Sequence, residues 1–255
     1  MSSDKLPNLL QGMLIGARED NKAGNSMEVL DDIPFQLDIS ALLTRLHIDR
    51  ESQDVKDFQR LVKKATSVAK PKAVYEVTYI ESKSYDTVDV GGVAFSSRVL
   101  RVNLDKIERV FPYIATCGTE LDEAIPASDD FMRLFWLDTL KEMALEASRK
   151  YLSNYLKRRY ALGQMSKMSP GEGSQDVWRI EEQKQLFSIF GNVEDLIGVK
   201  LTDSFLMIPN KSVSGIYFPT EIRFESCQLC PREVCRGRRA SYDTNLLESY
   251  YRDKA

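Results

Sequence analysis

The chain has 255 residues, of which 43% are hydrophobic and 29% charged, as in an ordinary globular protein with one large core. A formal net charge of −3 argues against a dedicated nucleic-acid binder, which usually carries a strong basic excess. No apolar run approaches the ~18–20 residues of a membrane span, and the N-terminus lacks a secretory signal. We therefore expect a cytoplasmic protein that binds neither nucleic acid nor membrane.

The N-terminal quarter predicts an arm, a strand and two helices. Residues 1–28 are rich in Ser, Asn, Asp and Gly, which predicts a mobile arm or a loosely docked helix. Residues 33–37 predict a short edge strand, because their proline is tolerated only at an edge. A helix is expected over 41–47. Apolar residues at three- and four-residue spacing predict a second helix that begins near Ser52 and ends before Pro71.

The middle of the chain predicts strands and one long helix. Runs of β-branched and aromatic residues predict strands over 73–80, 94–99 and 109–117. An apolar stripe at helical spacing predicts a helix over 131–160. Strands and helices alternate without a regular β-α-β rhythm, so we expect an α+β fold with an antiparallel or mixed sheet in a single domain.

A Pro-Gly loop and a distinctive string of residues follow this helix. Residues 169–174 read Ser-Pro-Gly-Glu-Gly-Ser, in which proline presets a turn and the glycines permit positive φ and close approach of a ligand to the backbone. A helix over 180–190 is predicted next. Residues 198–218 read GVKLTDSFLMIPNKSVSGIYF. This string resembles the stretch G-[MV]-[KT]-L-T-E-S-F-x-M-x-P-x-x-S-V-S-G-x-Y-F of the reactivation domain of cobalamin-dependent methionine synthase.

The resemblance extends more weakly upstream and implies a bent, mostly antiparallel sheet flanked by helices over residues 29–225. In the family, the domain binds S-adenosylmethionine and lies over the corrinoid of a neighbouring cobalamin domain. After oxidation to cob(II)alamin, an electron and the methyl group of S-adenosylmethionine regenerate methylcobalamin. No cobalamin-binding, homocysteine or folate module is recognisable here, so we expect a stand-alone form of the domain.

The family's ligand loop has the form Arg-x-x-Pro-Gly-Tyr and aligns with residues 167–172. The resemblance therefore implies that S-adenosylmethionine contacts Lys167, Ser169, Pro170, Gly171 and Glu172. Lysine replaces the family's arginine and cannot grip a carboxylate with two parallel hydrogen bonds, while glutamate replaces an aromatic residue and adds an anion. The family's acidic residue on the preceding helix corresponds to Glu142 or Glu146. Either one can neutralise an amino or sulfonium group, and the alternative is a solvated helix glutamate.

Three of the four cysteines lie within nine positions in a C-terminal extension over 226–255, at Cys227, Cys230 and Cys235. Such compact spacing is typical of thiolates that bind zinc or an iron–sulfur cluster, both of which normally take four ligands. The alternative is three ordinary thiols. The candidates for a fourth ligand are Cys117, His47, a carboxylate such as Glu233, or a non-protein group. A short amphipathic helix is expected over 241–252.

Two functions fit this sequence. The first is a reactivation component that acts in trans on a corrinoid protein or a shortened methionine synthase and supports reductive remethylation of cob(II)alamin with S-adenosylmethionine. Such a protein is a methyltransferase component or activator rather than a complete enzyme. The second is a redox or binding accessory protein that has lost S-adenosylmethionine and uses cysteine-bound zinc or an iron–sulfur cluster. The expected partners are the corrinoid protein and a flavodoxin- or ferredoxin-type electron donor.

Overall fold

One curled antiparallel sheet organises the chain, whose computed structural model describes residues 26–125, 129–174, 177–235 and 237–251. Its strands follow the order β4-β3-β2-β5-β9-β6, β1 pairs with β2 beside this path, and all of these pairs are antiparallel. A separate two-stranded sheet pairs β7 with β8. The α+β prediction with a mostly antiparallel sheet is confirmed. The strands are β1 (Ser26–Leu30), β2 (Lys72–Lys83), β3 (Thr87–Val90), β4 (Val93–Ser96), β5 (Arg109–Thr116), β6 (Met165–Met168), β7 (Lys200–Leu201), β8 (Met207–Ile208) and β9 (Ser212–Pro219).

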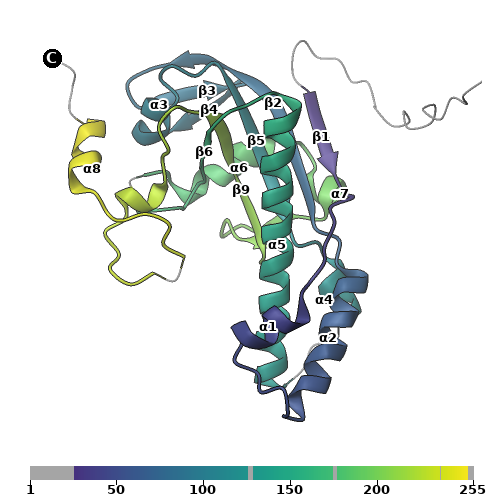
Figure 1. Cartoon of the computed structure of the whole chain (residues 1–255). Coiled ribbons are helices and arrows are strands. Elements are labelled where there is room, and N and C mark those ends of the chain that lie inside the picture. Colours follow the sequence, from purple (N-terminus) through teal and green to yellow (C-terminus); the bar gives the residue numbers. More distant parts are fainter. Residues whose placement is uncertain (1–25, 126–128, 175–176, 236, 252–255) are drawn as a thin grey trace, which may run out of the picture.

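The long helix α5 lies along one face of this sheet (Figure 1). Asp130 caps the helix by accepting hydrogen bonds from two backbone amides of its first turn. The core on this face includes the fully buried side chains of Phe58, Tyr75 and Leu140, and each contributes roughly 1.5–3 kcal/mol by leaving water. The helices around this core are α1 (Ile39–Arg45), α2 (Asp54–Val68), α4 (Glu120–Ala124) and α5 (Phe131–Arg159).

Two smaller cores lie away from α5. On the opposite face of the sheet, Phe187 and Phe190 pack against Val74 and Ile114. The third core joins β3, β4, β6 and β9 to the C-terminal extension, which contributes the fully buried Leu229. The extension therefore packs on the sheet through apolar contacts. The elements involved are α3 (Arg98–Asn103), η1 (Ile180–Glu182), α6 (Gln183–Ser188), α7 (Val193–Ile197), η2 (Ser226–Leu229) and α8 (Thr244–Tyr251).

Several predicted elements differ from the structure in local detail. Residues 33–37 form no strand. The strand of this region is β1, so residues 26–28 of the expected mobile arm are β-structure, while residues 1–25 lie outside the described part of the chain. The strand expected over 94–99 ends at Ser96, because the Ser97 hydroxyl accepts the Leu100 amide at 3.0 Å and caps α3. The predicted helix over 180–190 is divided between η1 and α6.

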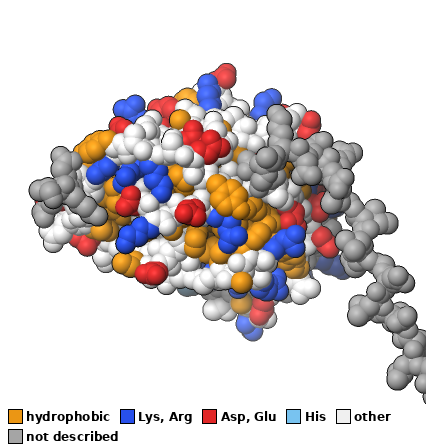
Figure 2. Space-filling view, turned by 90° about the horizontal axis from the view of Figure 1, so that it is seen from above, with side chains coloured by type: hydrophobic (Ala, Val, Ile, Leu, Met, Phe, Trp, Pro, Cys, Tyr) orange, Lys and Arg blue, Asp and Glu red, His pale blue; other side chains and the backbone are white. Residues whose placement is uncertain are grey.

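The surface carries charges of both signs. Figure 2 shows one face on which basic, acidic and apolar side chains are interspersed, and neither charge sign forms one continuous patch there. Within the described ranges, no helix is both long enough and apolar enough to cross a membrane.

Candidate functional site

A row of aromatic side chains crosses the sheet on the face that α5 covers. Tyr113 of β5 pairs with Gly215 of β9, and Lys167 of β6 pairs with Tyr217 of β9. Because side chains alternate along a strand, Tyr217 and Gly215 lie on the same face. The ring of Tyr217 stacks on that of Tyr113 with 4.4 Å between centroids. This register places Lys167 beside two stacked tyrosines.

Gly215 allows the Pro-Gly loop to begin directly over β9. A Cβ atom at this position would lie 2.4 Å from the Met168 carbonyl oxygen and 2.7 Å from the Ser169 hydroxyl oxygen. Both distances are too short for non-bonded atoms, so a side chain here would push the loop away from the strand.

The Pro-Gly loop is folded back on itself. Gly171 and Gly173 both have positive φ, at 79° and 98°. The Gly171 amide donates to the Trp178 carbonyl at 2.9 Å, and the Glu172 amide donates to the Ser169 carbonyl at 3.1 Å. These two amides are therefore paired within the protein and are not available to a ligand. The loop presents side chains instead.

Three buried polar atoms around the loop have no hydrogen-bond partner: Tyr113 Oη, Ser169 Oγ and Arg149 Nε. The Ser169 and Tyr217 hydroxyls lie close enough to Tyr113 to lower its pKa, although no contact of Tyr113 Oη or Ser169 Oγ meets the geometry of a hydrogen bond. An unpaired buried polar group costs about 1–3 kcal/mol, so folded proteins keep few of them without a reason. Their concentration here, from α5, β5 and the loop, is typical of a site that binds a polar ligand.

Both tyrosines at this site are neutral at physiological pH. Burial raises the pKa of Tyr113 to about 12, although Arg149 acts in the opposite direction. Burial also raises the pKa of Tyr217 above its ordinary value. Each hydroxyl therefore keeps its proton and can donate a hydrogen bond to a ligand.

An ion cluster joins the loop to the C-terminal extension. Lys167 Nζ lies 3.0 Å from Glu172 Oε2, and the Arg239 guanidinium contacts the other Glu172 oxygen. Arg239 Nε also lies 2.8 Å from Glu225 Oε2. The side chains of Lys167, Glu172 and Arg239 are only 12%, 21% and 33% exposed, so solvent screens this cluster less than an ordinary surface pair.

Glu172 is ionised in this cluster. Burial alone would raise the pKa of its carboxyl group, but the adjacent Lys167 and Arg239 outweigh burial and hold this pKa below the usual value. Two cations thus face one carboxylate beside the unpaired Tyr113, Ser169 and Arg149 atoms.

The two helix glutamates predicted from the resemblance have different surroundings. Glu146 pairs with Arg149 at 3.0 Å and so adjoins the site. Glu142 lies one turn earlier and pairs with Lys211 at 3.4 Å, together with Asp138 at 3.0 Å. Both carboxylates are more than half exposed. Glu146 therefore contacts a residue of the site, Arg149, whereas Glu142 contacts Lys211.

Cys117 lies in the core beneath α5, whereas the other three cysteines lie in the C-terminal extension. Cys117 is fully buried in the α5-side core, where burial raises the pKa of its thiol to about 11. Cys227 and Cys230 are half-buried around η2, and Cys235 is exposed. Across the described ranges, no three His, Cys, Asp or Glu side chains converge in a way that could hold a metal ion. As placed here, the thiols do not form a metal site.

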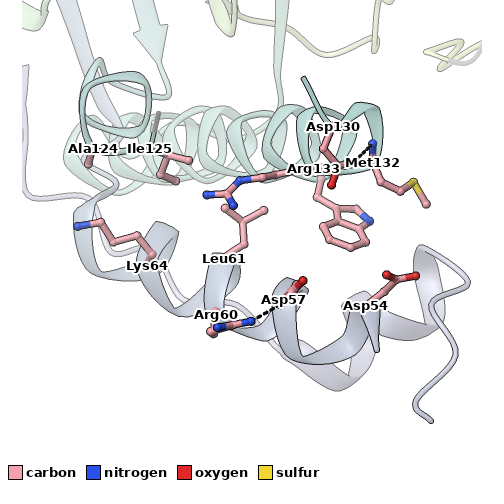
Figure 3. Close-up of a pocket in the computed structure, with 11 residues that line it drawn as sticks. Asp54, Asp57, Arg60, Leu61, Lys64, Ala124, Ile125, Asp130, Met132 and Arg133 are labelled. Carbon is pink, nitrogen blue, oxygen red and sulfur yellow. Dashed lines mark hydrogen bonds and ion pairs between the residues drawn. The ribbon is translucent and has the colours of Figure 1, made fainter. Parts of the chain in front are cut away.

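Cavities also lie elsewhere on the described part of the molecule. One of ≈ 610 Å³ lies between α2 and the first turns of α5, where Asp54, Lys64 and Arg133 line its walls (Figure 3). None of the residues predicted for the site lines it. Another, of ≈ 1360 Å³, lies between the core and α8 and includes Arg98 and Tyr250 among its lining residues.

The sequence did not identify four of the residues at this site: Tyr113, Arg149, Tyr217 and Arg239. Tyr113 reaches the loop only through the register of β5 with β9, which the sequence does not show. Arg149 follows Glu146 at helical spacing and could have been found from it. Arg239 is 67 positions from Glu172, and no sequence signal joins them.

Comparison with known proteins supports the resemblance over part of the chain. A family model for the activation domain of vitamin B12-dependent methionine synthase matches residues 152–225, which are less than half of the chain. Among solved structures, a crystal structure of the MetH reactivation domain bound to AdoHcy is similar, with a TM-score of 0.50 and 17% sequence identity. The likeness covers 79% of this chain and 81% of that one and shows a shared fold. No curated protein sequence matches the chain.

Proposed function

We propose that this chain is a reactivation component for a corrinoid protein and binds S-adenosylmethionine where α5, β5, β9 and the Pro-Gly loop meet. The family match over residues 152–225 contains the loop and β9, and the similar solved domain is described as bound to AdoHcy. The observation that carries the proposal is the group of three unpaired buried polar atoms, on Tyr113, Arg149 and Ser169. A polar ligand supplies partners for all of them.

The residues of the site have complementary tasks in this proposal. Lys167 and Arg149 attract the ligand's carboxylate, while the exposed carboxylate of Glu146 faces its amino or sulfonium group. The neutral hydroxyls of Tyr113 and Ser169 orient the ligand by hydrogen bonds. When a separate protein presents the corrinoid, an external donor would first supply one electron to cob(II)alamin. The methyl group of S-adenosylmethionine would then pass to the reduced cobalt, and S-adenosylhomocysteine would leave.

Calorimetric titration with S-adenosylmethionine tests this function, with and without a corrinoid protein. We expect binding by the wild-type chain and an affinity about tenfold weaker in Arg149→Gln, because a buried charge-assisted contact is lost. Arg133→Gln is the matched control, since it changes the same residue type at the distant end of α5. An absence of binding under both conditions would contradict the proposal.

A second candidate is a redox or metal-binding accessory role for residues 227–235, which contain three cysteines and are called the cysteine segment below. The ion pair between Glu172 and Lys167 favours this candidate, because Lys167 is the residue expected to bind the ligand's carboxylate. In this alternative, Cys227, Cys230 and Cys235 rearrange around zinc or an iron–sulfur cluster, and the loop binds no S-adenosylmethionine. Anaerobic purification followed by iron, sulfide and zinc analysis distinguishes the candidates. A metal-free protein that binds S-adenosylmethionine would support the reactivation role and exclude the metal-binding role.

A further inference from the structure

The C-terminal extension places a guanidinium directly on the ligand loop. Arg239 contacts one oxygen of Glu172, and Lys167 lies 3.0 Å from the other. The Glu172 carboxylate therefore forms ion pairs with two cations from different parts of the chain, Lys167 of β6 and Arg239 of the extension. Only 21% of the Glu172 side chain is exposed, so this carboxylate is largely withdrawn from solvent.

The residue next to Arg239 organises the cysteine segment. The Arg238 guanidinium donates hydrogen bonds to the carbonyl oxygens of Cys227 at 3.2 Å and Cys230 at 3.3 Å. The same guanidinium also donates to the carbonyls of Arg232 and Ala240. Because the two arginines are adjacent in the chain, a change in the cysteine segment that moves Arg238 also moves Arg239.

From these contacts we propose that Arg239 and Lys167 form a cradle for a ligand carboxylate, and that Glu172 occupies this cradle when no ligand is bound. A carboxylate-bearing ligand displaces Glu172 from the cradle. The direct ion pair between Arg239 and the loop is then broken, and the ligand lies between them. Ligand binding at the loop and the exposure of Cys227, Cys230 and Cys235 are then coupled, and the coupling acts in both directions. The choice of ligand rests on the proposed function, whereas the contact itself does not.

The rate of thiol modification in the cysteine segment tests the contact without any ligand. We expect Arg239→Gln and Glu172→Gln to label about five-fold faster than wild type, since each removes a half-buried ion pair that limits opening of the segment. Arg223→Gln is the matched control, because Arg223 pairs with Glu225 at 2.9 Å but is not bonded to Glu172. Equal labelling rates in Arg239→Gln and Arg223→Gln would overturn the proposed contact.

Titration with S-adenosylmethionine and with its decarboxylated analogue tests the cradle. We expect the carboxylate form to bind about tenfold more tightly to Glu172→Gln than to wild type, because the internal competitor is removed, and the decarboxylated form to gain nothing. Saturation of the wild type should also speed thiol labelling. If S-adenosylmethionine binds wild type and Glu172→Gln equally, the cradle is wrong although the proposed function stands. If it binds neither, both the function and the ligand class fall, and the labelling rates alone decide the contact.

Discussion

The Pro-Gly loop and the cysteine segment touch at Glu172, yet they are held in different ways. The loop begins directly over β9, and hydrogen bonds between its own backbone groups fix its turns. The cysteine segment has exposed residues throughout 231–235 and depends on arginine side chains that reach its carbonyls. Below it, Leu229 and Tyr250 are buried. The loop is therefore a rigid base, and the segment is an attachment that a few side chains control.

The largest effect is expected from adding a methyl group beneath the loop. In Gly215→Ala the new Cβ would collide with the Met168 carbonyl and the Ser169 hydroxyl, so either β9 or the loop must move. We expect a loss of about 3 kcal/mol in the free energy of unfolding, measured by urea denaturation. Gly163→Ala is the control, because nothing lies within 4 Å of its new Cβ. Similar losses in both variants would show that the loop does not rest on β9 as described.

A smaller and more local effect is expected from removing the anchor of the cysteine segment. Tyr250 is 6% exposed, packs edge-on against Phe224 and hydrogen-bonds to Asn103 at 3.0 Å. Tyr250→Ala should cost about 2 kcal/mol, the low end for loss of a large core side chain. Hydrogen exchange should show the loss in α8 and η2 while β5 and β9 stay protected. Tyr242→Ala, at a 40% exposed position, should leave exchange unchanged. Equal deprotection of β9 in Tyr250→Ala would mean that the extension is not a separable attachment.

Much of the fold could be predicted because local patterns and tertiary structure agree. The strands at 73–80 and 109–117 and the helix at 131–160 correspond to β2, β5 and α5, whose residues are strongly periodic and buried. The strand predicted over 33–37 is wrong, because the apolar side chains of Ile33 and Phe35 are buried without any strand pairing. Burial alone does not distinguish a strand from an extended connection.

The site was predictable only where it is local in sequence. The loop at 169–174 carries its own turn signals, and both of its glycines have positive φ. The partners of this loop depend on strand register and on the path of the extension, neither of which the spacing of residues reveals. Arg239 lies in a segment that the sequence linked only to metal binding. Its contact with Glu172 is a product of tertiary structure.

Removing one unpaired hydroxyl should separate stability from binding at the loop. Tyr113→Phe deletes a buried oxygen that has no hydrogen-bond partner, so we expect the protein to gain about 1 kcal/mol in unfolding free energy. The same change should weaken S-adenosylmethionine binding, because the variant lacks the hydroxyl that would donate a hydrogen bond to the ligand. Urea denaturation and calorimetry measure the two effects. A loss of stability would show that the hydroxyl is paired in the folded protein and would contradict a ligand contact at this position.

The same variant predicts a change in behaviour at high pH. The pKa of Tyr113 is raised from 10.0 to about 12, so the unfolded chain releases this proton first and wild-type stability falls as pH rises from 10 through 12. Phenylalanine has no proton to release, so Tyr113→Phe should show a shallower loss over this range. Unfolding curves at several alkaline pH values give both slopes. Identical slopes would mean that Tyr113 is not buried as the structure places it.

The smallest effect is expected at Cys117, and it limits the ligands open to the cysteine segment. This thiol is buried in the α5-side core, and burial raises its pKa to about 11, so it is neither ionised nor accessible near neutral pH. We expect Cys227, Cys230 and Cys235 to react with a thiol reagent in the folded protein and Cys117 to react only after denaturation. Cys117→Ala should leave both the labelling of the other three and any bound zinc or iron unchanged. Loss of metal in that variant would identify Cys117 as the fourth ligand. The cysteine segment would then have to reach the α5-side core, from which it is separate in this structure.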